Sequence, residues 1–306
     1  MENYSVKSPL ALWAAILILS ACGGGGGGGG GNVAPFVSYS QVGTNTEVSV
    51  ENGISNEVDY TYNVGTTTLT SLTNAQRGQS GAKVVASYDT SSNIATATLT
   101  TAGGTSVSWN SATDTIGTLL LNSNIETVVS ASGQNYTLIA NPFDFGWNYQ
   151  TFGTWLTGGG TGSGKAGNYS IGSPTTGASI PTTGTATYTG ATGGRYSSAA
   201  GLDYFVSSNL SAVANYATRS VALTSTSSVV SRDLLSQSSM NALNFTGSMT
   251  YAAASNSLTG TISTTGGLSG TANGQFYGPN ANELGGGFTA SGAGLELFSG
   301  AFGAKK

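Results

Sequence analysis

Residues 270–288 read Gly270-Thr-Ala-Asn-Gly-Gln-Phe-Tyr-Gly-Pro-Asn-Ala-Asn-Glu-Leu-Gly-Gly-Gly-Phe288, and the chain ends Gly300-Ala-Phe-Gly-Ala-Lys-Lys306. Pro279 and the glycines near it predict a tight connection between two strands, because proline fixes its φ angle and glycine accepts angles closed to other residues. Residues 285–287 are glycines, so neighbouring backbones can approach closely there, as a barrel seam requires. The stretch therefore predicts the closing hairpins of a β-barrel.

The same stretch resembles the final strands of the transferrin-binding protein B barrel domain, which also occurs in neisserial factor H-binding and related surface lipoproteins. That family has a Gly-Pro-x-Ala-x-Glu turn, then Gly-Gly-x-Phe, and a terminal Phe-Gly-Ala-Lys, which match residues 278–283, 285–288 and 302–305. Gly184–Gly190 and Leu258–Gly260 fit other recurrent strand ends. The resemblance covers about residues 147–306. It implies an all-β chain with a C-terminal eight-stranded antiparallel β-barrel, preceded by a smaller β-rich handle domain.

Within this turn, Gly278, Pro279 and Glu283 are expected to have structural roles. Glu283 is one of few charged residues in the chain and is expected to accept hydrogen bonds from loop amides. A catalytic Glu283 is the alternative.

Composition agrees with a secreted β-protein. Only 7% of the 306 residues are charged and 38% are apolar, with Gly, Ser, Thr and Asn filling the difference. These residues suit turns and the solvent-facing sides of strands, and they are poor in helix interiors. The net charge of −4 and the lack of a basic patch argue against a nucleic-acid partner.

The amino terminus predicts export and lipidation. Lys7 precedes an apolar run from Leu10 to Leu19, which has the length of a signal-peptide core. Leu19-Ser20-Ala21-Cys22 then resembles the bacterial lipobox, in which the cysteine thiol receives diacylglycerol and becomes the first residue after cleavage. An ordinary secretory signal with a chance cysteine is the alternative. Cys22 is the only cysteine, so intrachain disulfides are excluded.

These features predict four segments. Residues 1–21 are a lipoprotein signal peptide, and residues 22–32 are the acylated cysteine with a poly-Gly tether, Gly23 to Gly31. Residues 33–145 form the handle domain and residues 146–306 the barrel; Asn141-Pro142 breaks the last handle strand, and Asp144-Phe145-Gly146 marks the boundary. Gly23 lacks the acidic residue that favours inner-membrane retention in such lipoproteins, so the chain is expected at the outer membrane, facing the cell exterior. Facing the periplasm is the other possibility.

Alternation of apolar and polar residues predicts the strands. The expected strands are Val58–Val64, Val84–Tyr88, Ile94–Thr100, Ser106–Trp109, Gly117–Leu121, Glu126–Ser130, Tyr136–Ala140, Ala186–Thr189, Ser220–Thr224, Asn244–Tyr251 and Ser257–Ser263. Ser231–Leu243 is a weak helix candidate, and Thr157–Gly167 is expected to be a mobile or functional loop.

The sequence offers little catalytic chemistry. Histidine is absent, which removes the commonest general base and metal ligand. Each of the carboxylate pairs Glu47/Glu51 and Glu57/Asp59 could supply half of the ligands of a calcium site, but no Asp-x-Asp-x-Asp loop accompanies them. Gly162–Lys165 lacks the spacing of a phosphate-binding loop. The chain is therefore expected to be no enzyme and to need no cofactor or metal.

Aromatic residues are the remaining resource for binding. Most are expected in the core, but Tyr196, Tyr204 and Phe205 fall in a predicted connection, Gly193–Asn209, and with Arg195 fit a partner-binding patch. We expect a surface lipoprotein that binds a protein or a nutrient-related ligand, in the iron, haem or host-factor class, with haem ligation by tyrosine left open. A passive or adhesive coat protein is the alternative. The resemblance also implies an outer-membrane translocator as an export partner.

Overall fold

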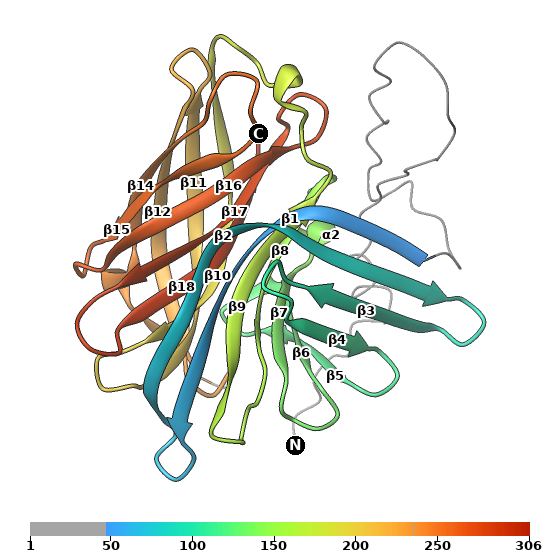
Figure 1. Cartoon of the computed structure of the whole chain (residues 1–306), viewed down its shortest axis with the longest axis vertical. Helices are drawn as coiled ribbons and strands as arrows, with labels where there is room; N and C mark the ends of the chain where they lie inside the picture. Colours follow the sequence, from blue (N-terminus) through green and yellow to red (C-terminus); the bar gives the residue numbers. More distant parts are fainter. Residues whose placement is uncertain (1–46, 235) are drawn as a thin grey trace.

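The computed structural model describes residues 47–234 and 236–306, which form two antiparallel sheets (Figure 1). The signal peptide, Cys22 and the glycine tether predicted from the sequence lie outside the described residues. The first sheet has nine strands in the order β4-β3-β2-β1-β9-β8-β7-β6-β5. Its strands are β1 (Glu47–Asn63), β2 (Thr68–Asp89), β3 (Ile94–Thr100), β4 (Ser106–Asn110), β5 (Thr115–Leu119), β6 (Asn122–Val129), β7 (Tyr136–Ala140), β8 (Gln150–Leu156) and β9 (Ser163–Gly172).

The second sheet closes on itself. Eight strands follow the order β11-β10-β18-β17-β16-β15-β14-β12, and β11 also pairs with β12, so they form the predicted eight-stranded barrel. A short strand, β13, pairs with the end of β12. These strands are β10 (Thr185–Ser197), β11 (Asp203–Asn215), β12 (Ser220–Ser231), β13 (Ser238–Ser239), β14 (Phe245–Thr250), β15 (Leu258–Thr264), β16 (Ser269–Tyr277), β17 (Glu283–Ser291) and β18 (Leu297–Lys305).

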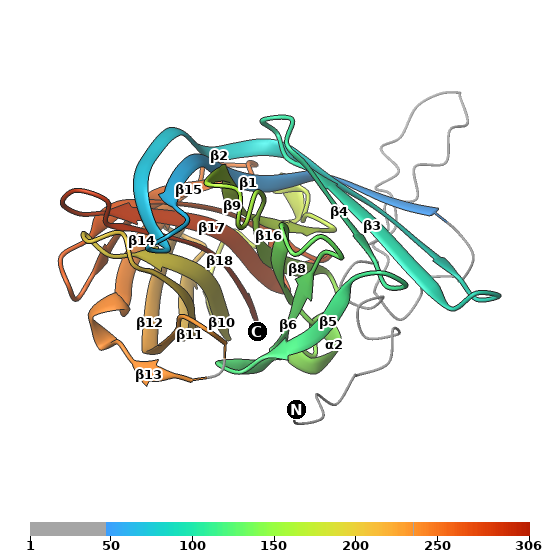
Figure 2. The same cartoon turned by 90° about the horizontal axis from the view of Figure 1, so that it is seen from below.

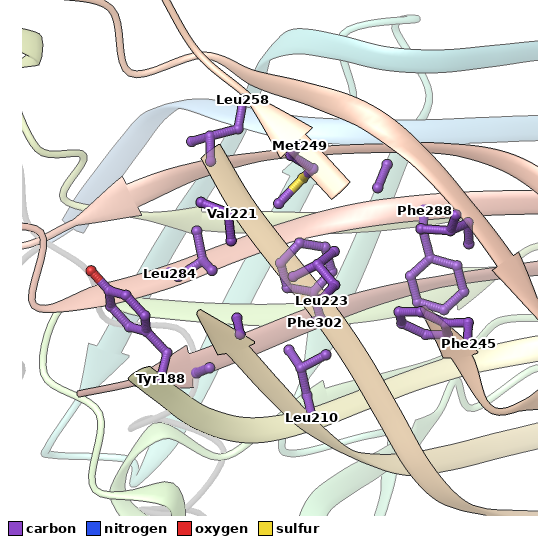
Figure 3. Packing of buried hydrophobic residues seen from close by; sticks show 14 of the residues in the cluster. Tyr188, Leu210, Val221, Leu223, Phe245, Met249, Leu258, Leu284, Phe288 and Phe302 are labelled. Carbon is purple, nitrogen blue, oxygen red and sulfur yellow. The ribbon is translucent and has the colours of Figure 1, made fainter. Parts of the chain in front are cut away.

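The barrel interior is a packed core. Phe245 and Phe298 both pack on Phe288, with ring centroids 4.9 and 4.8 Å away. Figure 3 shows aliphatic side chains from several strands, Leu210 and Leu223 among them, in the same space. All five side chains are at most 3% exposed. Side chains therefore fill the lumen, as they do in small barrels.

The predicted closing hairpin is present as β16 and β17. Its connection contains Gly278 at φ +81° and Ala281 at φ +53°, angles in the left-handed region. The buried Tyr188 hydroxyl donates a 2.6 Å hydrogen bond to the Ala281 carbonyl and fixes the turn against the barrel end. β17 then pairs along its whole length with β18.

The first sheet curls around its own core. Alternate residues of β2 and β3 are buried, including Val84, Ala86 and Leu99. Trp109, on the edge strand β4, donates a 2.7 Å hydrogen bond from Nε1 to Oγ1 of Thr137 on β7. The edge strand β4 is therefore in contact with β7, which lies in the other half of the sheet.

The sheets divide the chain later than the sequence predicts. The predicted boundary at residues 145/146 is wrong, because β8 and β9 pair with β7 and β1 in the first sheet. The Asn141-Pro142 break is only a short helix, α2 (Pro142–Phe145), capped by Asn141. Gln150–Leu156 then returns to the sheet with Phe152 and Trp155 buried.

Three other expectations are corrected. The predicted Thr157–Gly167 loop ends early, because β9 begins at Ser163. The Ser231–Leu243 helix does not form; the segment contains β13 and the single 3₁₀ turn η3 (Asn241–Leu243). The Gly193–Asn209 connection consists mostly of strand, with β10 reaching Ser197 and β11 starting at Asp203. Within the described residues, no helix has the length and apolar content that a bilayer span requires.

Candidate ligand-binding groove

We call the first sheet, β1 to β9, the handle sheet. A groove of about 890 Å³ lies between the handle sheet and one end of the barrel. The handle contributes residues of β1, β2, β7, β8 and β9, and the barrel contributes residues of β10, β11, β12 and β18 together with the segment after β12. The β1–β2 hairpin lies alongside the barrel end in both views (Figures 1 and 2). There, Leu69 donates a 2.8 Å backbone hydrogen bond to the Gly201 carbonyl in the β10–β11 turn. This bond links the two walls.

Strand register brings Arg195 to this groove. Arg195 of β10 is opposite Phe205 of β11, and its Cζ lies 4.6 Å from the centre of the Phe205 ring. One terminal nitrogen of Arg195 forms an ion pair with the Asp203 carboxylate. Burial lowers the pKa of Arg195 to about 10, while the nearby Tyr60 and Tyr136 act against that shift. The guanidinium therefore stays protonated at neutral pH.

Tyr196 and Tyr204 lie opposite each other in the same pair of strands and stack at 6.0 Å between ring centroids. Both pack against the barrel core. The Tyr196 hydroxyl donates a 3.0 Å hydrogen bond to Glu296, and burial is the main cause that raises its pKa to about 12. Tyr204 also lines the groove with Arg195 and Phe205. Three of the four residues predicted for a binding patch thus line the groove, Arg195 and Phe205 from one face of the β10–β11 pair and Tyr204 from the other, and Tyr196 packs on the barrel core beside Tyr204.

The handle wall contains aromatic residues that the sequence did not single out. Tyr60 of β1 donates a 2.6 Å hydrogen bond from its hydroxyl to the Thr157 carbonyl, and burial raises its pKa to about 12. The Tyr62 hydroxyl accepts a 2.5 Å hydrogen bond from the Gly160 amide. These bonds hold the glycine-rich 157–162 segment against the strand that carries both tyrosines. The signal was the alternation of Val58, Tyr60 and Tyr62, which places them on one face.

Half-buried leucines complete the walls. Leu69, Leu72 and Leu156 come from the handle, and Leu297 comes from the barrel. A concave space lined by apolar side chains and a few polar groups is typical of sites that bind small ligands.

The rim carries a second arginine. Arg232 is exposed, and its Cζ lies 5.8 Å from the centre of the Tyr204 ring. Asp233, next in the chain, accepts hydrogen bonds from the Ser236 amide at 3.0 Å and from the Ser231 hydroxyl at 3.3 Å. This carboxylate therefore organises its own turn.

Three of the four carboxylates considered for calcium, those of Glu51, Glu57 and Asp59, are engaged by other groups. Lys165 Nζ lies 2.8 Å from Asp59 and 3.7 Å from Glu57, and its hydrogen bond is the main cause that lowers the pKa of Asp59. Glu57 also accepts a 2.6 Å hydrogen bond from the Thr101 hydroxyl. Across residues 47–234 and 236–306, no group of three or more acidic, histidine or cysteine residues is arranged to hold a metal.

Glu283 lies away from the groove, at the junction of barrel and handle. Its carboxylate accepts hydrogen bonds from the amides of Asn148, at 2.6 Å, and Tyr149, at 3.0 Å. These are loop amides, the kind of donor that the sequence suggests for this residue. Burial outweighs these bonds and raises the pKa of Glu283 to about 7.

A handle sheet joined to a closed antiparallel barrel, with a groove between them, defines a nearly all-β protein. Residues 180–306 match the family model described as the C-lobe and N-lobe beta barrels of Tf-binding protein B. The resemblance to transferrin-binding protein B read from residues 270–306 is therefore confirmed: the chain carries a barrel of this type. No curated protein sequence matches the chain significantly.

The chain is also similar, at low identity, to solved structures, among them the following three. A mutant transferrin-binding protein B from Haemophilus parasuis Hp5 is 12% identical, with 83% of this chain and 76% of that chain covered and a TM-score of 0.43. Isotype 1 transferrin-binding protein B from serogroup B Neisseria meningitidis is 12% identical, covering 86% and 77%, with a TM-score of 0.40. A structure described as a surface lipoprotein is 15% identical, covering 83% and 98%, with a TM-score of 0.44. At such scores these likenesses support no argument, and the match to the family model is confined to the barrel residues 180–306.

Proposed function

We propose that the protein is a non-catalytic lipoprotein of the outer-membrane surface that binds a protein or a nutrient-related ligand. The observation that supports the proposal is that the structure has an open groove outside the barrel, whereas the barrel interior is filled. Side chains fill the barrel lumen, whereas the groove between barrel and handle has a volume of about 890 Å³. A ligand therefore meets the protein at the groove and the surrounding loops.

The anchor is supported by the sequence. Acylation of Cys22 would hold the folded part at a membrane, because each buried CH₂ group of a lipid chain contributes about 0.8 kcal/mol. The glycine tether of residues 23–31 would then separate the folded part from the lipid surface. Export through a dedicated outer-membrane translocator is part of the same proposal.

The test is a pull-down from serum with purified mature protein, together with an absorbance titration with haemin. We expect saturable binding in at least one assay, and we expect Ala166→Trp to abolish it, because Ala166 lines the groove on β9. Ala217→Trp is the matched control, since Ala217 is exposed in the turn between β11 and β12. Circular dichroism would verify that both variants fold.

Absence of binding in both assays would contradict the proposal and favour a passive or adhesive coat protein. Equal loss of binding in the Ala166→Trp and Ala217→Trp variants would contradict the role of the groove.

A further inference from the structure

The groove combines apolar walls with an unusual placement of positive charge. Charged residues make up 7% of the chain, yet two of its few arginines, Arg195 and Arg232, line this one space. They approach it from two barrel strands that flank β11, Arg195 near the end of β10 and Arg232 just after β12. Both lie over aromatic rings, Phe205 and Tyr204 respectively.

Arg195, the arginine inside the groove, is held in a position from which it can bind an anion. A guanidinium has five N–H donors, and Asp203 takes an ion pair with one terminal nitrogen of Arg195. The Phe205 ring covers one face of the guanidinium, and 18% of the side chain remains exposed where it lines the groove. Its position is thus fixed by the ring and the carboxylate, so binding an anion costs little side-chain entropy.

Arg232, the arginine at the rim of the groove, has no ion-pair partner among the described residues. Of the two acids nearby, Asp203 is paired with Arg195 and Asp233 accepts hydrogen bonds from Ser231 and Ser236. The groove lining thus contains two arginines and two aspartates, and Arg232 is the arginine that has no ion pair among the described residues.

The apolar walls indicate the rest of the ligand. Leu69, Leu72, Leu156 and Leu297 are only half-buried, although each faces a concave space. Covering them with an apolar group releases water at roughly 25 cal/mol per Å² of buried surface. The volume of 890 Å³ lies within the range of roughly 300–1,000 Å³ that is usual for small-molecule sites.

We infer that this groove binds a small organic acid with an aromatic or otherwise apolar body. The carboxylate pairs with Arg232, with Arg195 as the second cation of the groove lining, and the body lies along the leucines and tyrosines of the handle wall. Arginine suits this task because its planar N–H groups match the two oxygens of a carboxylate. The inference rests on the proposed function, since it names the ligand chemistry of the same groove.

The test compares three fluorescent probes that share one apolar body. 4-(1-Pyrenyl)butyrate, the corresponding alcohol and the corresponding amine would each be titrated with the full chain carrying Cys22→Ala, followed by fluorescence anisotropy. We expect the acid to bind at least about 10-fold more tightly than the alcohol or the amine, a difference of about 1.4 kcal/mol. Equal affinities, or no saturable binding of the acid, would overturn the inference.

Two variants locate the site. Arg232→Gln is expected to weaken binding of the acid about 5- to 10-fold and to leave the alcohol unchanged, because Arg232 is exposed and its loss does not disturb the fold. Lys83→Gln is the control, since it removes a surface cation that pairs with Glu51 on β1, outside the groove. If both variants lower the affinity for the acid equally, the acid does not bind at Arg232 and the proposed location of the site is wrong.

A third variant tests the body of the ligand. Leu72→Ser is expected to weaken the acid and the alcohol alike, and an unchanged affinity for both would contradict the assignment of the handle wall. The probe assay is independent of the pull-down and the haemin titration. Probe binding without a captured partner would leave this inference standing and the capture function refuted.

Discussion

The carboxylate of Glu283, at the start of barrel strand β17, accepts a 2.6 Å hydrogen bond from the backbone amide of Asn148, which leads into handle strand β8. Lys305 is opposite Glu283 on β18, and its Nζ donates a 3.0 Å hydrogen bond to the Gly146 carbonyl. Two charged residues of the barrel thus hold one segment of the handle. In a chain so poor in charge, this contact is a main polar connection between the two parts.

Stability is expected to fall as Glu283 ionises. Burial raises its pKa from 4.5 to about 7, although the amides of residues 148–150 and Lys305 act in the opposite direction. Because the folded-state pKa lies above the unfolded value, the protonated group favours the folded state below pH 4.5, and this contribution is lost as the pH rises through about 7. The loss is on the order of 3 kcal/mol.

Urea unfolding at several pH values, compared between the wild type and Glu283→Gln, measures this contribution. Glutamine does not ionise, so the variant is expected to lack the decrease between pH 4.5 and 8. Glu47→Gln, at an exposed position, serves as the control and should follow the wild type. If the free energy of unfolding varied with pH in the same way for the wild type and Glu283→Gln, the pH dependence would not come from Glu283.

Glycines allow the barrel and the handle to pack closely. A Cβ atom on Gly287 of β17 would lie 2.3 Å from Oδ1 of Asn168 and 2.4 Å from Nδ2 of Asn56. Those two atoms share a buried 2.8 Å hydrogen bond. Gly287→Ala is therefore expected to lower the free energy of unfolding by about 1–3 kcal/mol.

The matched control is Gly65→Ala in the β1–β2 turn, where the nearest atom would lie at an ordinary 3.4 Å. Thermal unfolding followed by circular dichroism compares the two variants. Equal midpoints would show that the Asn56–Asn168 contact tolerates a methyl group and that the packing argument is wrong.

The curl of the handle sheet depends on the bond from Trp109 to Thr137. Trp109→Phe leaves the buried Thr137 hydroxyl without this donor, and Thr137→Val leaves the indole N–H without this acceptor. Each single change is expected to destabilise the fold by about 1–3 kcal/mol, whereas the double variant recovers part of the loss because neither polar group is then unpaired. Chemical denaturation of all four proteins gives the coupling energy. Strictly additive losses would mean that the bond contributes nothing.

The alternation of apolar and polar residues was sufficient to predict the regular strands. Tyr136–Ala140 is predicted and observed with the same bounds, and the hairpin of Val84–Tyr88 with Ile94–Thr100 is observed as parts of β2 and β3. The closing hairpin was readable because Gly278 and Pro279 restrict the backbone locally. These features depend on residues close together in the chain, so a single sequence reveals them.

The groove depends on pairings between distant residues. The β1–β2 hairpin has several register shifts, with Asn52 and Asn74 at positive φ, so the face on which Leu69 and Leu72 lie does not follow from simple alternation. The domain boundary was misplaced for a similar reason, since β9 pairs with β1, more than a hundred residues earlier. Arg195 and Phe205 were picked by residue type, but only the pairing of β10 with β11 places one against the other.

Labelling of intact cells would show whether the protein is acylated and faces the cell exterior, as we propose. A membrane-impermeant amine reagent would be applied to cells that carry the wild-type chain or Cys22→Ala, with a periplasmic protein as the internal control. We expect lysines such as Lys83 and Lys306 of the wild-type protein to be labelled in intact cells while the periplasmic control is not. A wild-type protein that is labelled only after lysis, or a Cys22→Ala protein that is retained and labelled at the surface just as the wild type is, would contradict it.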